Sequence, residues 1–149
     1  MKKCFFIILL LFFSKNTSAQ HIDSAFDHHA LAVKNIENSV NFYSQILQLN
    51  SINTPVDNPQ IKWFSLGENL QLHLIQIDGL DIKTHKANHF SVHVENIPSF
   101  VDFLVHKDID YWDWVGNKGQ IALRPDGVQQ VYIQDPDGYW IEINDAKYE

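Results

Sequence analysis

The chain has 149 residues, and its 18 acidic and 11 basic side chains give a formal charge of −7 with neutral histidines. This acidic balance argues against nucleic acid or an anionic membrane surface as a partner. Cys4 is the only cysteine, which excludes a disulfide framework within the chain and a zinc site built from several thiolates.

The first residues have the three-part layout of a secretory signal. A basic Met-Lys-Lys start is followed by an apolar run over 4–13 and by small residues up to Ala19, after which we expect cleavage. The run is too short for a membrane anchor, which needs about twenty apolar residues. The sequence therefore predicts an exported protein, periplasmic or secreted and not held in a membrane, made of residues 20–149. Three basic residues leave with the signal, so 8 basic side chains face 18 acidic ones and the mature charge is −10.

The mature chain contains an internal repeat. A shift of 61 residues places 28–43 over 89–104, and six of the sixteen aligned positions are identical, far more than random pairing gives. We therefore expect one domain with two copies of one structural unit, at about 26–78 and 88–145. The identical pairs are His28 with His89, Val33 with Val94, Asn35 with Asn96, Ile36 with Ile97, Val40 with Val101, and Phe42 with Phe103.

Each copy begins with the same two elements. Along 28–33 and 89–94, polar or small residues alternate with larger residues, as is typical of a half-buried strand. Asn35 and Asn96 follow in N-cap positions, and the apolar residues behind them have helical spacing. Each unit therefore starts with a strand and a helix.

Each copy ends in a predicted hairpin. In the first, strands at 61–66 and 70–77 flank a short turn, and the polar stretch 78–88 links the copies. In the second, strands at 131–134 and 139–144 flank Asp135-Pro136-Asp137-Gly138, which has type I turn chemistry. Further strands are expected around 111–115 and 120–123. The fold class is thus α+β, with two βαβββ modules forming a curved mixed sheet.

Four residues occupy comparable places in the two copies. His28 and His89 head the first strand of each copy, whereas His73 and Glu142 lie on the last strands, a few residues past a turn glycine. If the copies pair about an approximate twofold axis, the four side chains meet. Three imidazoles and a carboxylate favour zinc, nickel, iron or cobalt over calcium or magnesium. We predict one divalent metal ion at these residues; manganese also stays open.

Several other side chains near these positions are candidates for a role at the site. His29 should face the helices and be structural, whereas His93 shares a face with His89 and either lines the cavity or supports the ligands. The only arginine, Arg124, either binds an anionic substrate group or forms an ordinary salt bridge. Trp112 and Trp114 either stack on a planar substrate or pack within the protein, and packing is the favoured reading.

The stretch 27–36 leading to Phe42-Tyr43, together with 135–142, resembles the glyoxalase / bleomycin resistance / extradiol dioxygenase superfamily, also called vicinal oxygen chelate (VOC). The resemblance covers essentially the whole mature chain. It implies that His28, His89 and Glu142 are metal ligands. Glyoxalase I enzymes that resemble the chain have a glutamate at the position of His73, so the histidine is a departure from that branch.

The resemblance implies a glyoxalase-like lyase or isomerase that acts on a small substrate with two neighbouring oxygens. Glu142 and His73 are the candidate catalytic groups, and a homodimer is expected. The alternatives are a ring-cleaving dioxygenase and a non-catalytic protein that binds a drug or toxin. Export argues against glutathione as a co-substrate. The two halves of the site pair either within one chain or between two chains of a dimer.

Overall fold

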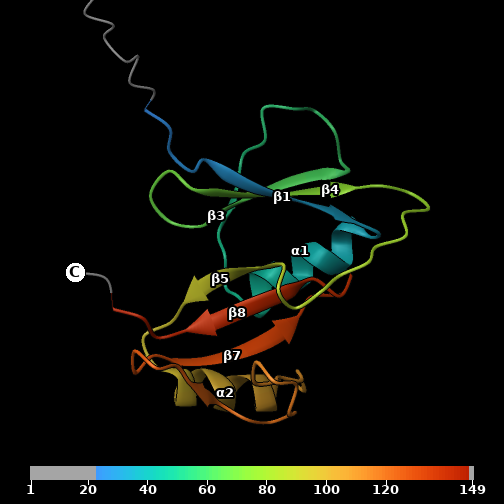
Figure 1. The fold of residues 1–149 in the computed structure, drawn as a ribbon. Coiled ribbons are helices and arrows are strands. Elements are labelled where there is room, and N and C mark those ends of the chain that lie inside the picture. Colours follow the sequence, from blue (N-terminus) through green and yellow to red (C-terminus); the bar gives the residue numbers. More distant parts are fainter. Residues whose placement is uncertain (1–22, 148–149) are drawn as a thin grey trace, which may run out of the picture.

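The computed structural model describes residues 23–147 (Figure 1). The predicted secretory signal at 1–19 lies outside them, so export stays a prediction. Within 23–147, no helix is long and apolar enough to cross a lipid bilayer.

The first unit contains a four-stranded mixed sheet and one helix. Its sheet has the strand order β1-β4-β3-β2, with β1 parallel to β4 and the other neighbours antiparallel. The elements in chain order are β1 (His28–Val33), α1 (Ile36–Gln45), β2 (Ser51–Ile52), β3 (Ile61–Ser65) and β4 (Gln71–Gln76).

The second unit repeats this topology. Its strand order is β5-β8-β7-β6, with β5 parallel to β8. The structure therefore confirms an α+β fold of two βαβββ units, with β1 and β5 as equivalent edge strands. The elements are β5 (His89–His93), α2 (Ile97–His106), β6 (Ala122–Leu123), β7 (Gln129–Gln134) and β8 (Trp140–Asn144).

Both helices start at the predicted asparagines. The Asn35 side chain accepts a hydrogen bond from the N–H of Asn38 at 2.9 Å, and Asn96 accepts one from Ser99 at 2.8 Å. Each bond satisfies a donor that the first helical turn leaves without a partner. The two N-caps are thus confirmed.

The region between α2 and β7 differs from the prediction. The strand expected at 111–115 is wrong, because only Trp112 forms isolated bridges there. The carboxylate of Asp113 accepts hydrogen bonds from the N–H groups of Gly116 and Asn117 at 2.7 and 2.8 Å, and the chain turns back on itself. The strand expected at 120–123 is shortened to β6. The two-residue β2 was not predicted, since it is too short to show alternation.

One face of each sheet packs against the other elements, and the second face is more polar. In β4, Leu72 and Leu74 are fully buried, whereas His73 between them is partly exposed. Ile141 and Ile143 of β8 are fully buried in the same way. The buried faces of both units join one hydrophobic core, so neither unit has a core of its own.

The turn between β7 and β8 docks the second unit onto the first. The Tyr43 hydroxyl of α1 donates to Asp135 Oδ2 at 2.8 Å, in a buried position. The carboxylate of Asp137 accepts from the backbone N–H of Lys34 at 3.2 Å, and the Tyr139 hydroxyl donates to the carbonyl of Ala32 at 3.0 Å. The predicted turn is therefore also the polar contact that fixes the relative position of the units.

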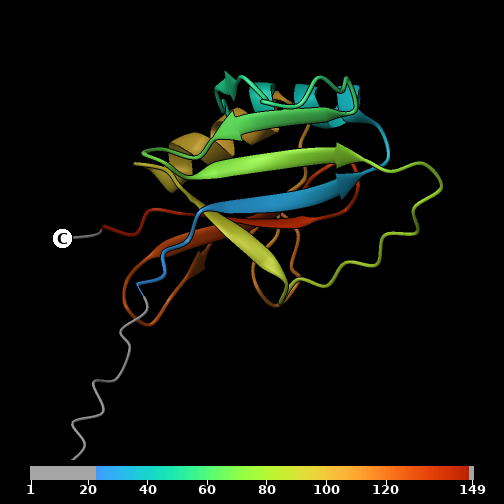
Figure 2. The same ribbon diagram turned by 90° about the horizontal axis from the view of Figure 1, so that it is seen from above.

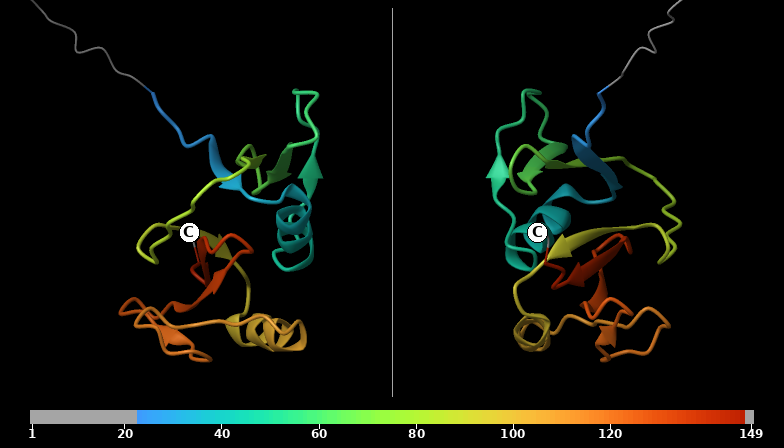
Figure 3. Two further views of the ribbon diagram at one scale, coloured as in Figure 1. Left: turned by 90° about the vertical axis from the view of Figure 1, so that its right-hand side faces the viewer. Right: turned by 60° about the vertical axis from the view of Figure 1, so that its left-hand side comes forward.

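The two sheets do not face each other with their polar sides. Seen from above, β3, β4 and β1 lie side by side (Figure 2), whereas β5 belongs to the other sheet and lies beneath the first sheet in Figure 1. In the left view of Figure 3, α1 lies beneath the first sheet and α2 lies beside the second. The helix-free faces consequently point in different directions.

We predict that Tyr43→Phe destabilises the protein. The change removes the hydrogen-bond donor to Asp135. Burial raises the pKa of Asp135, and the hydrogen bond from Tyr43 lowers it. Loss of a buried hydrogen bond to a carboxylate should reduce the free energy of unfolding by about 1.5–3 kcal/mol, measured by urea denaturation. Tyr111→Phe is the matched control, because that hydroxyl donates to the Gly119 carbonyl at an exposed site. Equal losses in both variants would contradict the docking role.

Candidate metal centre

His28 and His73 form the first pair of predicted ligands. Their rings are stacked, with centroids 4.3 Å apart and an interplanar angle of 16°. Trp63 of β3 covers the other face of the His73 ring at 3.9 Å and 7°. The parallel register of β1 and β4 brings the two histidines to one sheet face, as strand alternation predicted.

Neighbouring side chains orient both rings. Asp27 Oδ2 lies 2.6 Å from His28 Nδ1, and Gln71 Oε1 lies 2.8 Å from His73 Nε2. Both partners are acceptors, so the histidine nitrogen donates in each bond. His28 Nε2 and His73 Nδ1 take no part in these hydrogen bonds, so these are the nitrogens that could bind a metal.

The His73 ring favours its neutral state. Burial lowers its pKa below the ordinary value of 6.5, and the charge of His28 lowers it further, against an opposing effect of Asp27. Because only a neutral imidazole can donate a lone pair, this shift suits His73 to ligation or to accepting a proton near neutral pH.

His89 and Glu142 form the second pair. His89 Nε2 lies 3.3 Å from Glu142 Oε2, and His89 Nδ1 donates to the backbone carbonyl of Lys86 at 2.7 Å. The imidazole thus presents Nε2 to the carboxylate. Glu142 is buried and accepts hydrogen bonds from the Tyr132 hydroxyl at 2.6 Å and from Asn144 Nδ2 at 2.8 Å.

The surroundings of Glu142 keep it ionised. Burial alone would raise its pKa, but the hydrogen bonds from Tyr132 and Asn144 and the charges of His89 and Arg124 outweigh burial and lower it. The same contact raises the pKa of Tyr132, with burial as the larger cause. A carboxylate with a lowered pKa is a weak base and a good ligand.

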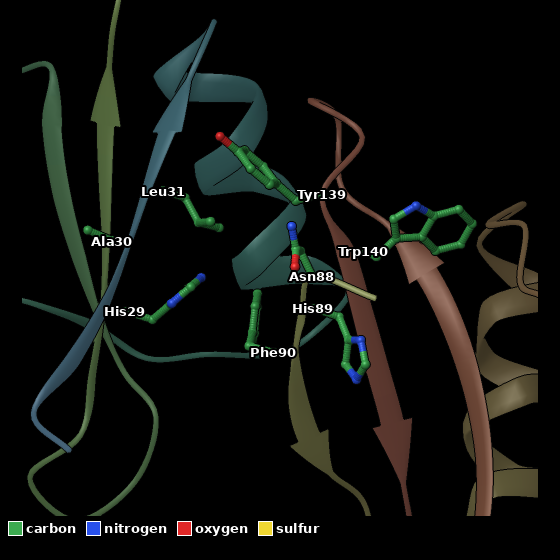
Figure 4. A pocket seen from close by; sticks show the side chains of 8 residues that line it. All are labelled: His29, Ala30, Leu31, Asn88, His89, Phe90, Tyr139 and Trp140. Carbon is green, nitrogen blue, oxygen red and sulfur yellow. The ribbon is translucent and has the colours of Figure 1, made fainter. Parts of the chain in front are cut away.

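The structure brings the four predicted ligands together as two pairs and not as one cluster. Within residues 23–147, no three histidine or acidic side chains are placed to hold one metal ion. In Figure 4, His29 and Leu31 point from β1 toward β5, whereas Ala30 points away. His28 lies two residues before Ala30 in β1 and therefore shares its face. The His89 ring points away from β1. The two pairs therefore face outward from the junction of the units.

The cleft at this junction is not the predicted site. It has a volume of about 340 Å³ and includes His89 as its only predicted ligand. The His29 ring lies 5.3 Å from the Phe90 ring inside it, which agrees with a structural role for His29. The residues that line the cleft are His29, Ala30, Leu31, Asn88, His89, Phe90, Tyr139 and Trp140 (Figure 4).

The structure also shows the positions of the side chains for which the sequence left two interpretations open. Arg124 pairs with Asp126 at 2.6 Å and lies 3.7 Å from Glu142, so it belongs to the second pair's surroundings. Trp112 packs edge-on against Trp140, whereas Trp114 is half exposed beside the His89 ring. His93 is exposed, at the edge of another hollow with Phe26 and Val92.

Sequence reasoning missed several supporting residues. Tyr132 lies directly opposite Glu142 in the register of β7 and β8, and the polar alternation of Gln130, Tyr132 and Gln134 was the signal that could have identified it. The Lys86 carbonyl left no such signal, because a backbone acceptor depends on chain geometry and not on residue type.

The comparisons with known proteins define the family. The chain belongs to the Glyoxalase/Bleomycin resistance protein/Dioxygenase superfamily, whose model matches residues 25–143. A curated relative, "Glyoxylase I 4" of Arabidopsis thaliana, is 28% identical over 127 residues, which cover 80% of this chain and 70% of the relative.

Solved structures share the fold. "Oxidase ChaP-H2" superposes with a TM-score of 0.69 at 19% identity, covering 85% of this chain and 97% of that one. A glyoxalase family protein from Bacillus anthracis superposes with a TM-score of 0.67 at 23% identity, covering 87% of this chain and 100% of that one. Lactoylglutathione lyase from Agrobacterium tumefaciens superposes with a TM-score of 0.63 at 18% identity, covering 83% of this chain and 95% of that one.

We predict that acid weakens the junction between the units through His29. Burial lowers the pKa of His29 below 6.5, and the charge of His28 adds to this. The unfolded chain therefore binds the proton more readily, so the free energy of unfolding should fall as the pH drops below about 6.5. Between pH 7.5 and 5.5, the melting temperature of His29→Gln should depend less steeply on pH than that of the wild type. Identical slopes would contradict this role.

Proposed function

We propose that the chain is a metal-dependent, glyoxalase-like enzyme whose site is completed by a second copy. His28 and His73 of one copy and His89 and Glu142 of the other would bind one divalent cation. The observation that carries this proposal is that each of the three histidines donates one ring N–H to a protein acceptor and keeps the other nitrogen available. This arrangement is typical of metal-ligating histidines.

The donor set fits a divalent cation. Three imidazoles and one carboxylate give a nitrogen-rich site, which suits zinc, nickel, iron or cobalt better than calcium. The ionised state of Glu142 and the neutral state of His73 are the protonation states that ligation requires.

A second copy is needed because the pairs diverge. The face of each sheet that holds a pair is open, and the loop and strand beside His89 expose Val115 and Leu123. Exposed apolar side chains around a polar centre are typical of a contact surface. A dimer that places the first sheet of one copy over the second sheet of the other would cover this surface and join the pairs. Two equivalent sites would result.

The proposed reaction is a lyase or isomerase step on a small substrate with two neighbouring oxygens. The metal supplies Lewis acidity, which stabilises negative charge on a substrate oxygen. Glu142 is held ionised by Tyr132 and Asn144, so its main role is ligation, and it is a weak proton acceptor. His73 is the second candidate proton acceptor, but only while its Nδ1 is not bound to the metal, because its Nε2–H already donates to Gln71.

His73 separates this chain from a housekeeping glyoxalase. The glyoxalase I branch that the chain resembles has a glutamate at this position, and an imidazole is a different base and a neutral ligand. We also propose export, which would place the protein away from cytosolic glutathione. Both points favour a substrate other than the glutathione hemithioacetal.

A ring-cleaving dioxygenase is the second candidate. Two histidines and one carboxylate are the ligand set of many non-haem iron oxygenases, and His28, His89 and Glu142 supply that set. Oxygen uptake by the iron-loaded protein with a catechol would favour it over the lyase. A protein that binds metal and small molecules without turnover would instead be a sequestering protein.

Complementation between two inactive variants tests the shared site. The first variant carries His28→Ala and His73→Ala, and the second carries His89→Ala and Glu142→Gln. Neither should bind the metal tightly by itself. A mixed dimer, purified through two different tags, contains one complete set of four ligands if the site is shared between copies. It should recover about half of the metal that the wild-type dimer binds.

The measurement is metal content by mass spectrometry after dialysis, together with the mass of the particle by light scattering. A mixed dimer without tightly bound metal would overturn the shared site. Wild-type protein without metal would overturn metal dependence itself.

A further inference from the structure

Arg124 is placed as a cationic binding group beside Glu142. It follows β6 and begins a tight turn in which its carbonyl accepts the N–H of Gly127 at 2.9 Å. Asp126 holds Nη2 at 2.6 Å, and Nη1 lies 3.7 Å from Glu142 Oε1. The side chain is 37% exposed, so the guanidinium also reaches the open face of the sheet.

Glu142 does not use Arg124 as a hydrogen-bond donor. A separation of 3.7 Å is too long for a hydrogen bond, and the carboxylate already accepts short bonds from Tyr132 and Asn144. Within the described part of the chain, Nη1 makes no hydrogen bond of ordinary length. The guanidinium is therefore anchored at one end and has donors left for a ligand.

Trp114 forms an aromatic wall close to the same carboxylate. Its ring lies 6.2 Å from His89, edge-on, and 5.6 Å from the Tyr132 ring. Trp114 is 49% exposed, although a tryptophan normally buries most of its surface. An exposed aromatic ring beside a polar centre is suited to stacking on a planar ligand.

The loop that carries Trp114 is held in place. Lys86 Nζ donates to the carbonyls of Asp113 and Trp114 at 2.8 and 3.5 Å, and it lies 4.5 Å above the Trp140 ring. The carboxylate of Asp113 accepts two backbone N–H groups of the same loop. The wall is therefore ordered before a ligand arrives, which lowers the entropic cost of binding.

We propose that this surface selects a planar aromatic substrate with a carboxylate next to an oxygen-bearing ring carbon. The carboxylate would bind Arg124 and the ring would stack on Trp114, so that the neighbouring oxygens lie at His89 and Glu142. The proposal names the substrate class of the site proposed above and rests on that function for catalysis. Recognition by Arg124 and Trp114 does not itself need the metal.

The test compares two probes, 2-hydroxybenzoate and its neutral isostere 2-hydroxybenzamide. Binding is followed by tryptophan fluorescence and calorimetry, with metal-loaded wild type and with metal-free Glu142→Gln, which lacks one proposed metal ligand and the negative charge beside Arg124. In both proteins the acid should bind about tenfold more tightly than the amide. Arg124→Gln should remove this preference, whereas Arg124→Lys should keep part of it, since lysine retains the charge without the planar fork.

Two further variants separate the contribution of stacking to binding from that of charge. Trp114→Leu should weaken both probes by a similar factor, because it removes stacking and leaves the charge. Lys118→Gln is the matched control, since it removes an exposed cation paired with Asp110 in the same loop region, and it should change neither constant. Equal affinity for acid and amide, or an unchanged preference in Arg124→Gln, would overturn the proposal. The Glu142→Gln comparison decides this even if the wild type binds no metal.

Discussion

The arrangement of the molecule depends on one polar contact, the docking of the β7–β8 turn onto the first unit. Asp135 is held by the buried hydroxyl of Tyr43, and Asp137 by the backbone of Lys34. These bonds fix how the second sheet is turned relative to the first, while a shared hydrophobic core supplies most of the stabilisation. The direction in which each ligand pair faces follows from this contact.

The internal repeat explains why the two pairs of predicted ligands are alike in construction and different in chemistry. In both units the leading histidine lies on the strand that is parallel to the last strand, so a second side chain from that strand comes next to it. In the first unit the neighbour is His73, stacked beneath Trp63; in the second it is Glu142, held by Tyr132. The first unit offers two nitrogen donors, and the second adds the negative charge of Glu142.

Much of the fold followed from the sequence, because its signals are local. Alternation placed His28, His73 and Glu142 on the correct strand faces, and two asparagines marked the helix starts. The separation of the predicted ligands into two pairs did not follow from the sequence, since periodicity gives the face of a strand and not the rotation of one sheet against another. The supporting contacts of Trp63, Tyr132 and Lys86 depend on register across the sheet or on backbone geometry, which no local pattern encodes.

The most direct test of the proposed shared site is a crystal structure of the metal-loaded protein with anomalous diffraction at the absorption edge of the metal. We expect one peak at about 2.0–2.2 Å from ring nitrogens of His28 and His73 in one copy and from His89 and Glu142 in a second copy. A peak bound by residues of a single copy, or one away from these four side chains, would contradict it.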